Sequence, residues 1–144
     1  MSAAVRTAVP ASPRLAVAPR ADNRLPLILD AAARFFSEKG FGYTSMRDIA
    51  GMAGMLPGSL YYHFASKEEL LVAVYAEGVR RIKEAVAPAL AKEGDPWTRL
   101  ENACAAHLDG LLEDSDYGQV VIRVRPDDAP EVAERLIALR DEYE

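Results

Sequence analysis

Side chains that can bind phosphate oxygens are concentrated in residues 44–71, which read TSMRDIAGMAGMLPGSLYYHFASKEELL. The stretch supplies hydroxyls, an imidazole, a guanidinium and an ammonium group, and all of these are usual partners of a nucleic-acid backbone. An arginine can also make a bidentate contact with a base edge. The side chains concerned are Thr44, Ser45, Arg47, Ser59, Tyr61, Tyr62, His63 and Lys67. Their chemistry predicts binding to a polyanion.

The chain offers little for catalysis or metal binding. Cys104 and His107 lie three residues apart on one predicted helix, but the sequence holds only two histidines and one cysteine. A zinc site needs about four ligands. The sequence also lacks a glycine-rich phosphate loop and a Ser/His/Asp set. We therefore expect that the protein is not an enzyme and that it binds neither a metal ion nor a cofactor.

Two short helices are predicted to position the polar side chains. Ser45 can cap the first helix, and Asp48 lies three residues on, where the acid of a capping box lies. Gly54 ends this helix, and Pro57 suits the first turn of the next one, which Leu60 anchors to the core. Two short helices joined by a tight glycine-containing turn predict a helix-turn-helix. In that motif the second helix lies in the major groove of DNA.

This stretch resembles the TetR-type bacterial transcriptional regulators. The resemblance rests on TSMRDIA at 44–50 and LYYHFASKEEL at 60–70, and it covers about residues 24–75 closely. It implies backbone contacts by Thr44 and Ser45, a base or phosphate contact by Arg47, base contacts near Pro57, Gly58 and Ser59, and phosphate contacts by Tyr61, Tyr62, His63 and Lys67. Leu56 departs from the pattern, because a small polar residue is common there. With a leucine at this position the second helix has no side-chain cap. The Leu56 side chain would either touch a thymine methyl or pack against the protein.

Helical periodicity extends through the rest of the chain. A helix is predicted from the cap Asn23 to Lys39. The S-x-x-E box at 66–69 opens a long helix, which Pro88 should kink or end. Further helices are expected from Pro96 to about 111, over 120–124, where a strand is the alternative, and from about 130 after a loop at 126–130. The prediction is an all-α fold with a disordered basic tail (1–22), a three-helix helix-turn-helix head (23–66) and part of a helical effector-binding and dimerisation body (67–144).

An apolar stripe in the predicted body has two interpretations. Such a stripe is typical of plain core, whereas the family resemblance implies that effectors bind in the core of the body. On the second interpretation the pocket residues are Trp97, Leu100, Cys104, His107, Leu108, Leu111, Val121 and Arg123. Arg123 would pair with an anionic effector such as an acyl-CoA, or remain a solvated surface charge.

Charge is unevenly distributed along the chain. The net charge is -5, yet residues 1–67 hold eight basic and four acidic residues, against nine and eighteen in residues 68–144. A basic head on an acidic body fits a protein whose head alone meets a polyanion. The single cysteine permits no internal disulfide and fits a reducing cytosol. No apolar run approaches the roughly 20 residues that a membrane span needs.

These patterns predict a cytoplasmic, nucleoid-associated bacterial regulator that binds double-stranded operator DNA. We expect repression that a small apolar or acyl-type effector releases. The alternative is an effector-independent architectural or nucleoid-associated DNA-binding protein without a ligand cavity. The sequence stops within a helical pattern that no glycine or proline closes. We therefore expect a longer, homodimeric full-length protein, and a 144-residue chain that alone is monomeric or weakly associating.

Overall fold

A computed structural model describes residues 24–113 and 115–144, so the predicted tail and the predicted cap at Asn23 lie outside the described residues. The described residues form helices only, which confirms the predicted all-α fold. The elements are α1 (Arg24–Lys39), α2 (Met46–Met52), α3 (Pro57–His63), α4 (Lys67–Ala91), α5 (Pro96–Leu112), α6 (Asp116–Arg123), the 3-10 turns η1 (Pro126–Asp128) and η2 (Pro130–Val132), and α7 (Ala133–Tyr143). Within this part of the chain, no helix has the length and apolar character needed to cross a membrane.

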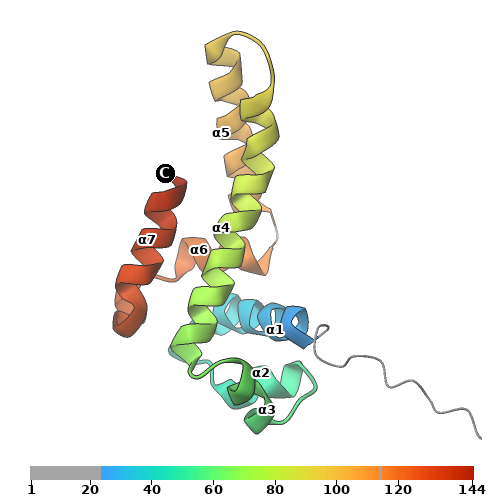
Figure 1. Cartoon of the computed structure of the whole chain (residues 1–144), viewed down its shortest axis with the longest axis vertical. Helices are drawn as coiled ribbons and strands as arrows, with labels where there is room; N and C mark the ends of the chain where they lie inside the picture. The colour runs from blue at the N-terminus through green and yellow to red at the C-terminus, as the bar shows by residue number, and fades with distance from the viewer. Residues whose placement is uncertain (1–23, 114) are drawn as a thin grey trace, which may run out of the picture.

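The helices are distributed along one long axis (Figure 1). α4 and α5 form a long hairpin whose turn lies at one end of the molecule, and α2 and α3 lie at the opposite end, beyond α1. α6 packs against both α1 and α4, and α7 runs beside α4. The two short helices therefore project from one end, where a flat or grooved partner can reach them.

One continuous hydrophobic core runs from α1 to α7. Its largest fully buried side chains are Phe36, Ile28, Ile49, Leu60, Leu70, Leu71, Leu136, Val74 and Val120. A second, small cluster of Val86, Ala89 and Ala103 joins α4 to α5 near the hairpin turn. α4 packs against α1, α6 and α7, and α1 also packs directly against α6, so these four helices share one closely packed core.

Capping side chains fix the starts of α2, α4 and α5 where the sequence predicts them. Ser45 accepts a hydrogen bond from the backbone N–H of Asp48, and the Asp48 carboxylate accepts one from the Ser45 N–H at 3.1 Å, which completes the predicted box. The Asp95 carboxylate likewise accepts from the Thr98 N–H at 3.1 Å and starts α5. Residues 120–124, ambiguous in the sequence, form the end of α6 and its C-cap.

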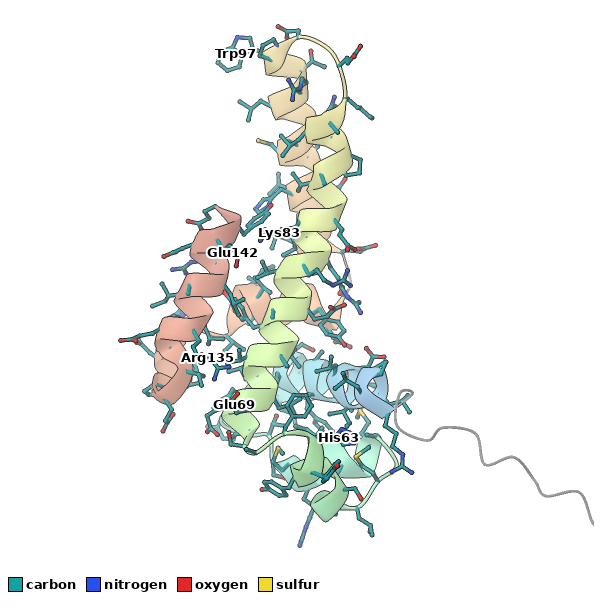
Figure 2. All side chains as sticks on the ribbon, in the orientation of Figure 1. His63, Glu69, Lys83, Trp97, Arg135 and Glu142 are labelled. Atoms are coloured by element: carbon teal, nitrogen blue, oxygen red, sulfur yellow. The ribbon has the colours of Figure 1, made fainter. Side chains whose placement is uncertain are left out.

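The capping box at the start of α4 differs from the prediction. Ser66 accepts from the backbone N–H of Glu69, but the Glu69 carboxylate does not return to the cap. It accepts from Arg135 of α7 at 2.5 Å instead, and Figure 2 shows this pair between the two helices. The predicted capping box is therefore half formed, because the Glu69 carboxylate pairs with a cation of α7, a contact that no local pattern reveals.

Two other helix boundaries differ. α4 continues through Pro88 to Ala91, so the proline does not end the helix. The carbonyl that would accept from residue 88 belongs to Glu84, which is exposed and can bond to water. The predicted loop at 126–130 is folded into η1 and the start of η2, so α7 begins at Ala133 rather than at about residue 130.

The predicted apolar stripe of α5 turns away from the core. The exposed fractions are 76% for Trp97, 51% for Leu100 and 53% for Leu108, and Cys104 is also exposed. Figure 2 shows Trp97 at the hairpin tip, pointing away from α4. Small residues face α4 instead, since a Cβ added at Gly110 would lie only 3.7 Å from the Cβ of Ala85. Close packing of small residues therefore outweighs the burial of the larger apolar face.

Candidate nucleic-acid interface and effector pocket

The segment before α2 is held against the end of α1 by one buried hydroxyl. Thr44 is 3% exposed, and its Oγ1 donates to the carbonyl oxygen of Gly40 at 2.8 Å, with that of Phe35 at 3.3 Å. The hydrogen of this hydroxyl is used inside the fold, and the predicted contact of Thr44 with the DNA backbone stays a prediction. Ser45 is exposed, but its Oγ accepts from the Asp48 N–H and donates to the Asp48 carboxylate, so both bonds of this hydroxyl lie within the α2 cap.

The turn between α2 and α3 fixes the angle at which α3 projects. Gly54 has a φ of 68°, the left-handed region that side chains rarely adopt, and the Met55 N–H donates to the carbonyl of Ala50 at 2.9 Å. α3 then begins with Pro57, whose missing N–H has no acceptor at a helix start. Leu60 is fully buried and holds α3 on the core.

The outer face of α3 follows from the position of Leu60. At about 100° per residue, Gly58 and Tyr62 lie on the side of α3 opposite Leu60, and Ser59 and Tyr61 lie at its two flanks. The exposed fractions agree: 89% for Tyr62 and 53% for Tyr61, with Gly58 exposed and Ser59 half-buried. α3 therefore presents two phenol hydroxyls, one serine hydroxyl and one bare stretch of backbone outward.

His63 and Lys67 differ in how far they remain available. His63 is half-buried, and its ring meets the edge of Tyr62 at 5.8 Å between centroids. The Lys67 ammonium donates to the carbonyl oxygen of Phe41 at 2.8 Å and lies 4.2 Å from the centre of the Phe41 ring. This contact ties the start of α4 to the segment after α1. It uses one of the three donors of a half-buried ammonium, so the phosphate contact of Lys67 stays a prediction.

Three exposed side chains complete this end of the molecule. Arg47 on α2 is exposed and has no hydrogen bond or ion pair with the described part of the chain. Tyr43 is 87% exposed and Leu56 is 76% exposed. Tyr43 is absent from the predicted set, although an aromatic residue two positions before the helix cap Ser45 is a sequence signal that could have identified it. We call the exposed set Tyr43, Arg47, Leu56, Gly58, Tyr61 and Tyr62 the α2–α3 face.

The body contains a small apolar pocket between α4, α5, α6 and α7. Its volume is about 270 Å³, and its lining consists of Val79, Ile82, His107, Leu111, Val121, Ile122, Arg140, Tyr143 and Glu144. The His107 and Tyr143 rings stack at 5.5 Å between centroids, and their Nδ1 and hydroxyl atoms lie 2.5 Å apart. The pocket thus has an apolar wall with one hydrogen-bonding pair and one ion pair, in which the Arg140 guanidinium lies 3.8 Å from the Glu144 carboxylate.

The predicted pocket residues are only partly brought together. His107, Leu111 and Val121 line the 270 Å³ pocket. Trp97, Leu100, Cys104 and Leu108 lie on the exposed side of α5, away from it. Arg123 is not in the lining either, because its guanidinium donates to the Ser37 carbonyl of α1 at 3.2 Å. Among the described residues, no group of three or more His, Cys, Asp or Glu side chains could hold a metal ion.

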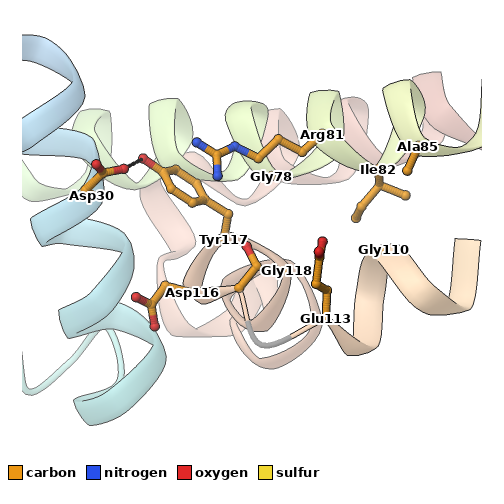
Figure 3. A pocket seen from close by; sticks show the side chains of 11 residues that line it. Asp30, Gly78, Arg81, Ile82, Ala85, Gly110, Glu113, Asp116, Tyr117 and Gly118 are labelled. Atoms are coloured by element: carbon orange, nitrogen blue, oxygen red, sulfur yellow. Dashed lines mark hydrogen bonds between the residues drawn. The ribbon is translucent and has the colours of Figure 1, made fainter.

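A second cavity, of about 450 Å³, lies where α1, α4, α5 and α6 meet, and the sequence analysis did not anticipate it. There the Tyr117 hydroxyl donates to Asp30 at 2.7 Å, and Arg81 lies 3.9 Å above the Tyr117 ring (Figure 3). Burial, and next the bond to Asp30, raise the pKa of Tyr117, so its hydroxyl stays a donor. Gly78 permits α6 to pack closely against α4, because a Cβ at this position would lie 2.7 Å from Val121 Cγ2 of α6.

Comparisons with known proteins agree with this arrangement. Residues 28–74 match the family described as bacterial regulatory proteins, tetR family. The HTH-type transcriptional repressor KstR2 of Mycobacterium tuberculosis is 51% identical over 55 residues, which cover 38% of this chain and 28% of that protein. The HTH-type transcriptional activator FasR of Mycolicibacterium smegmatis is 33% identical over 123 residues, which cover 81% of this chain and 56% of FasR.

A solved structure extends the similarity to the body. The structure of AibR in complex with isovaleryl coenzyme A and operator DNA has a TM-score of 0.71 and 26% identity, and the match covers 83% of this chain and 65% of AibR. The present chain thus spans from about a quarter to about two thirds of the length of these similar proteins.

Proposed function

We propose that the chain is a transcriptional repressor of the tetR family of bacterial regulatory proteins, which its residues 28–74 match, and that it binds operator DNA through its α2–α3 face. A small apolar or acyl-type effector in the body would release it. On this proposal the protein acts in the bacterial cytoplasm, at the nucleoid. A family of regulators gives no reason to expect catalysis, and we propose none.

One observation carries the DNA-binding proposal. The side of α3 opposite its core anchor holds Gly58 and Tyr62, and Tyr62 is 89% exposed at the end of the molecule farthest from the hairpin turn. Its hydroxyl is suited to a phosphate oxygen, and Arg47 on the preceding helix adds a cation. An exposed aromatic side chain gains from a partner that covers its ring and bonds its hydroxyl.

The effector proposal rests on the 270 Å³ pocket. Binding sites for drug-sized ligands usually span about 300–1,000 Å³, so a pocket of 270 Å³ suits a short apolar or branched acyl group. Arg140 and the His107–Tyr143 pair supply polar partners at its wall. The isovaleryl coenzyme A named in the AibR structure is a compound of this class. The cavity favours this proposal over an effector-independent architectural protein.

We also propose that two copies act together. A twofold dimer reads two half-sites about one helical turn of DNA apart, or a multiple of it. Binding both half-sites at once raises the affinity beyond that of one head. A single seven-residue recognition helix such as α3 offers few contacts, so pairing is the physical route to tight binding.

The test is a titration of a labelled duplex taken from the DNA upstream of the protein's own gene. We expect a complex that forms more tightly than with a scrambled duplex of the same composition and that weakens as salt rises. Isovaleryl coenzyme A, added at increasing concentration, should reduce the bound fraction. Equal binding to both duplexes would contradict operator recognition, whereas selective binding that no acyl-CoA changes would contradict only the effector proposal.

A further inference from the structure

Leu56 lies at the N-cap of α3, where its carbonyl oxygen accepts from the N–H groups of Ser59 and Leu60 but its side chain caps nothing. Its backbone is extended, with φ -74° and ψ 147°, and its side chain makes no capping hydrogen bond. It is 76% exposed, whereas Leu60, four residues on, is fully buried. A large apolar side chain held in water at the end of a rigid turn gains free energy when an apolar partner covers it.

The first residues of α3 have no hydrogen-bonding side chain. Leu56, Pro57 and Gly58 carry no polar side-chain atom, and Ser59 behind them is half-buried. A Cβ built at Gly58 would meet nothing within 4 Å, so the backbone there is open and can approach a surface closely. The side chains of residues 56–58 can therefore contact DNA only through apolar atoms, while the Ser59 hydroxyl and the backbone N–H groups are the polar atoms at this end of the helix.

The major groove offers one apolar group to such a side chain. Each base pair presents donors and acceptors there, and only thymine adds a methyl group, at C5. Leu56 can satisfy none of the donors or acceptors, and the charged phosphates would leave it wet. The contact that covers it without leaving a polar group unpaired is the contact with a thymine methyl.

We propose that Leu56 is a specificity-determining residue that recognises the 5-methyl group of one thymine in each half-site of the operator. This inference rests on the proposed function, because it requires α3 to lie in the major groove. It adds that the chain selects a T·A pair at this position by apolar contact, in place of the hydrogen bond that a small polar residue could make.

The experiment begins with selection of duplexes by the wild-type chain from a random 24-base-pair library. The enriched duplex is then synthesised with deoxyuridine in place of each thymine in turn, which removes one methyl group. We expect one thymine per half-site at which this change weakens wild-type binding about fourfold, the factor for about 0.8 kcal/mol per buried methyl at 1.4 kcal/mol per tenfold. Leu56→Ala should bind the two duplexes equally.

Two variants keep the interpretation clear. Leu112→Ala removes another leucine, 72% exposed on α5, and should keep the wild-type response to deoxyuridine. Leu56→Ser restores a side-chain cap, so its melting temperature should rise while its preference for thymine is lost. Equal responses of the wild type and Leu56→Ala at every thymine overturn the inference alone. Failure of the wild-type chain to enrich any sequence overturns the proposed function together with it.

Discussion

The ammonium of Lys67 lies 2.8 Å from the carbonyl oxygen of Phe41 and 4.2 Å from the centre of the Phe41 ring. Together with the hydroxyl of Thr44, which donates to the carbonyl oxygen of Gly40, this contact holds the segment between α1 and α2 in place. Tyr62, five residues before Lys67, is 89% exposed. Neighbouring residues of one motif therefore have different tasks: Thr44 and Lys67 support the face, and Tyr62 belongs to it.

We predict that Lys67→Ala lowers the free energy of unfolding by about 1–2 kcal/mol, because it removes a hydrogen bond from a charged donor and a cation–π contact. Urea unfolding measures this. Lys92→Ala, which changes an exposed lysine at the end of α4, is the matched control and should leave stability unchanged. An unaltered unfolding curve for Lys67→Ala, together with weaker DNA binding, would show that Lys67 contacts phosphate and does not contribute to stability.

At this scale the sequence predicts which residues share a motif but not which side chains turn inward. Ser45 and Asp48 were predictable, because a capping box is local. Thr44 was not, because its burial depends on the chain turning at Gly40, with a φ of 87°, and returning to α1. Hydroxyls that look equivalent in the sequence are separated by the path of the backbone.

At the scale of elements, α4 carries an ion-pair cluster whose strength depends on pH. The Glu77 carboxylate accepts from Arg80 and Arg81, and the hydrogen bond from Arg80 is the main reason that the pKa of Glu77 falls to about 2. The same Arg81 covers the ring of Tyr117 in α6. Glu77 thus orients a guanidinium that joins α4 to α6.

Because folding lowers the pKa of Glu77 from 4.5 to about 2, its contribution to stability is complete above pH 4.5 and is lost as the pH falls toward 2. We predict that Glu77→Gln lowers the free energy of unfolding at pH 7 by about 1–2 kcal/mol, less than the full shift implies because both arginines are about half exposed. It should also flatten the stability curve between pH 4.5 and 2. Unfolding measured across this range tests the prediction, and a variant curve parallel to the wild type would contradict it.

α6 is fastened to α1 by a second set of contacts. Tyr117 donates to Asp30 at 2.7 Å, and Ser37 donates to Asp116 at 2.7 Å. These residues are 87 and 79 positions apart in the sequence. The existence of α1 was predictable from periodicity, and α6 was expected only over residues 120–124, with a strand as the alternative. No local pattern encodes which helix pairs with which. The polar contacts between them could not be predicted for that reason.

We predict that Tyr117→Phe lowers the free energy of unfolding by about 1 kcal/mol, because the aromatic packing stays and one hydrogen bond is lost. Amide hydrogen exchange in α1 should quicken in the same variant, since α1 loses a tie to the body. Tyr43→Phe changes an 87% exposed tyrosine and should alter neither quantity. Identical behaviour of the two variants would show that the bond to Asp30 contributes nothing in solution.

At the scale of the whole molecule, the outward side of α5 is the largest difference from the sequence-based prediction. A stripe of large apolar residues predicts a buried face, yet Trp97, Leu100 and Leu108 are more than half exposed. The direction of a helix face is decided by what packs against it, and here Ala103 and Gly110 face α4. That choice depends on the tertiary arrangement, and periodicity alone cannot make it.

We predict that replacing Leu100 and Leu108 together by lysine changes the free energy of unfolding by less than about 0.5 kcal/mol, because exposed side chains contribute little to the core. Leu136→Ala in α7, which removes a side chain only 1% exposed, should cost about 2–5 kcal/mol under the same conditions. Thermal unfolding at micromolar concentration compares the variants. A large loss in the double lysine variant would show that this side of α5 is covered in solution.

The central proposal is that, among the described residues, the α2–α3 face is the surface that contacts DNA. Amide hydrogen exchange of the chain, measured with and without its enriched duplex, tests this most directly. The account predicts slower exchange with DNA across residues 43–63 and unchanged rates in α5 and the outer part of the hairpin, which lie at the opposite end of the molecule. Protection that appears in α5 or α7 while residues 43–63 exchange as in the free chain would contradict it.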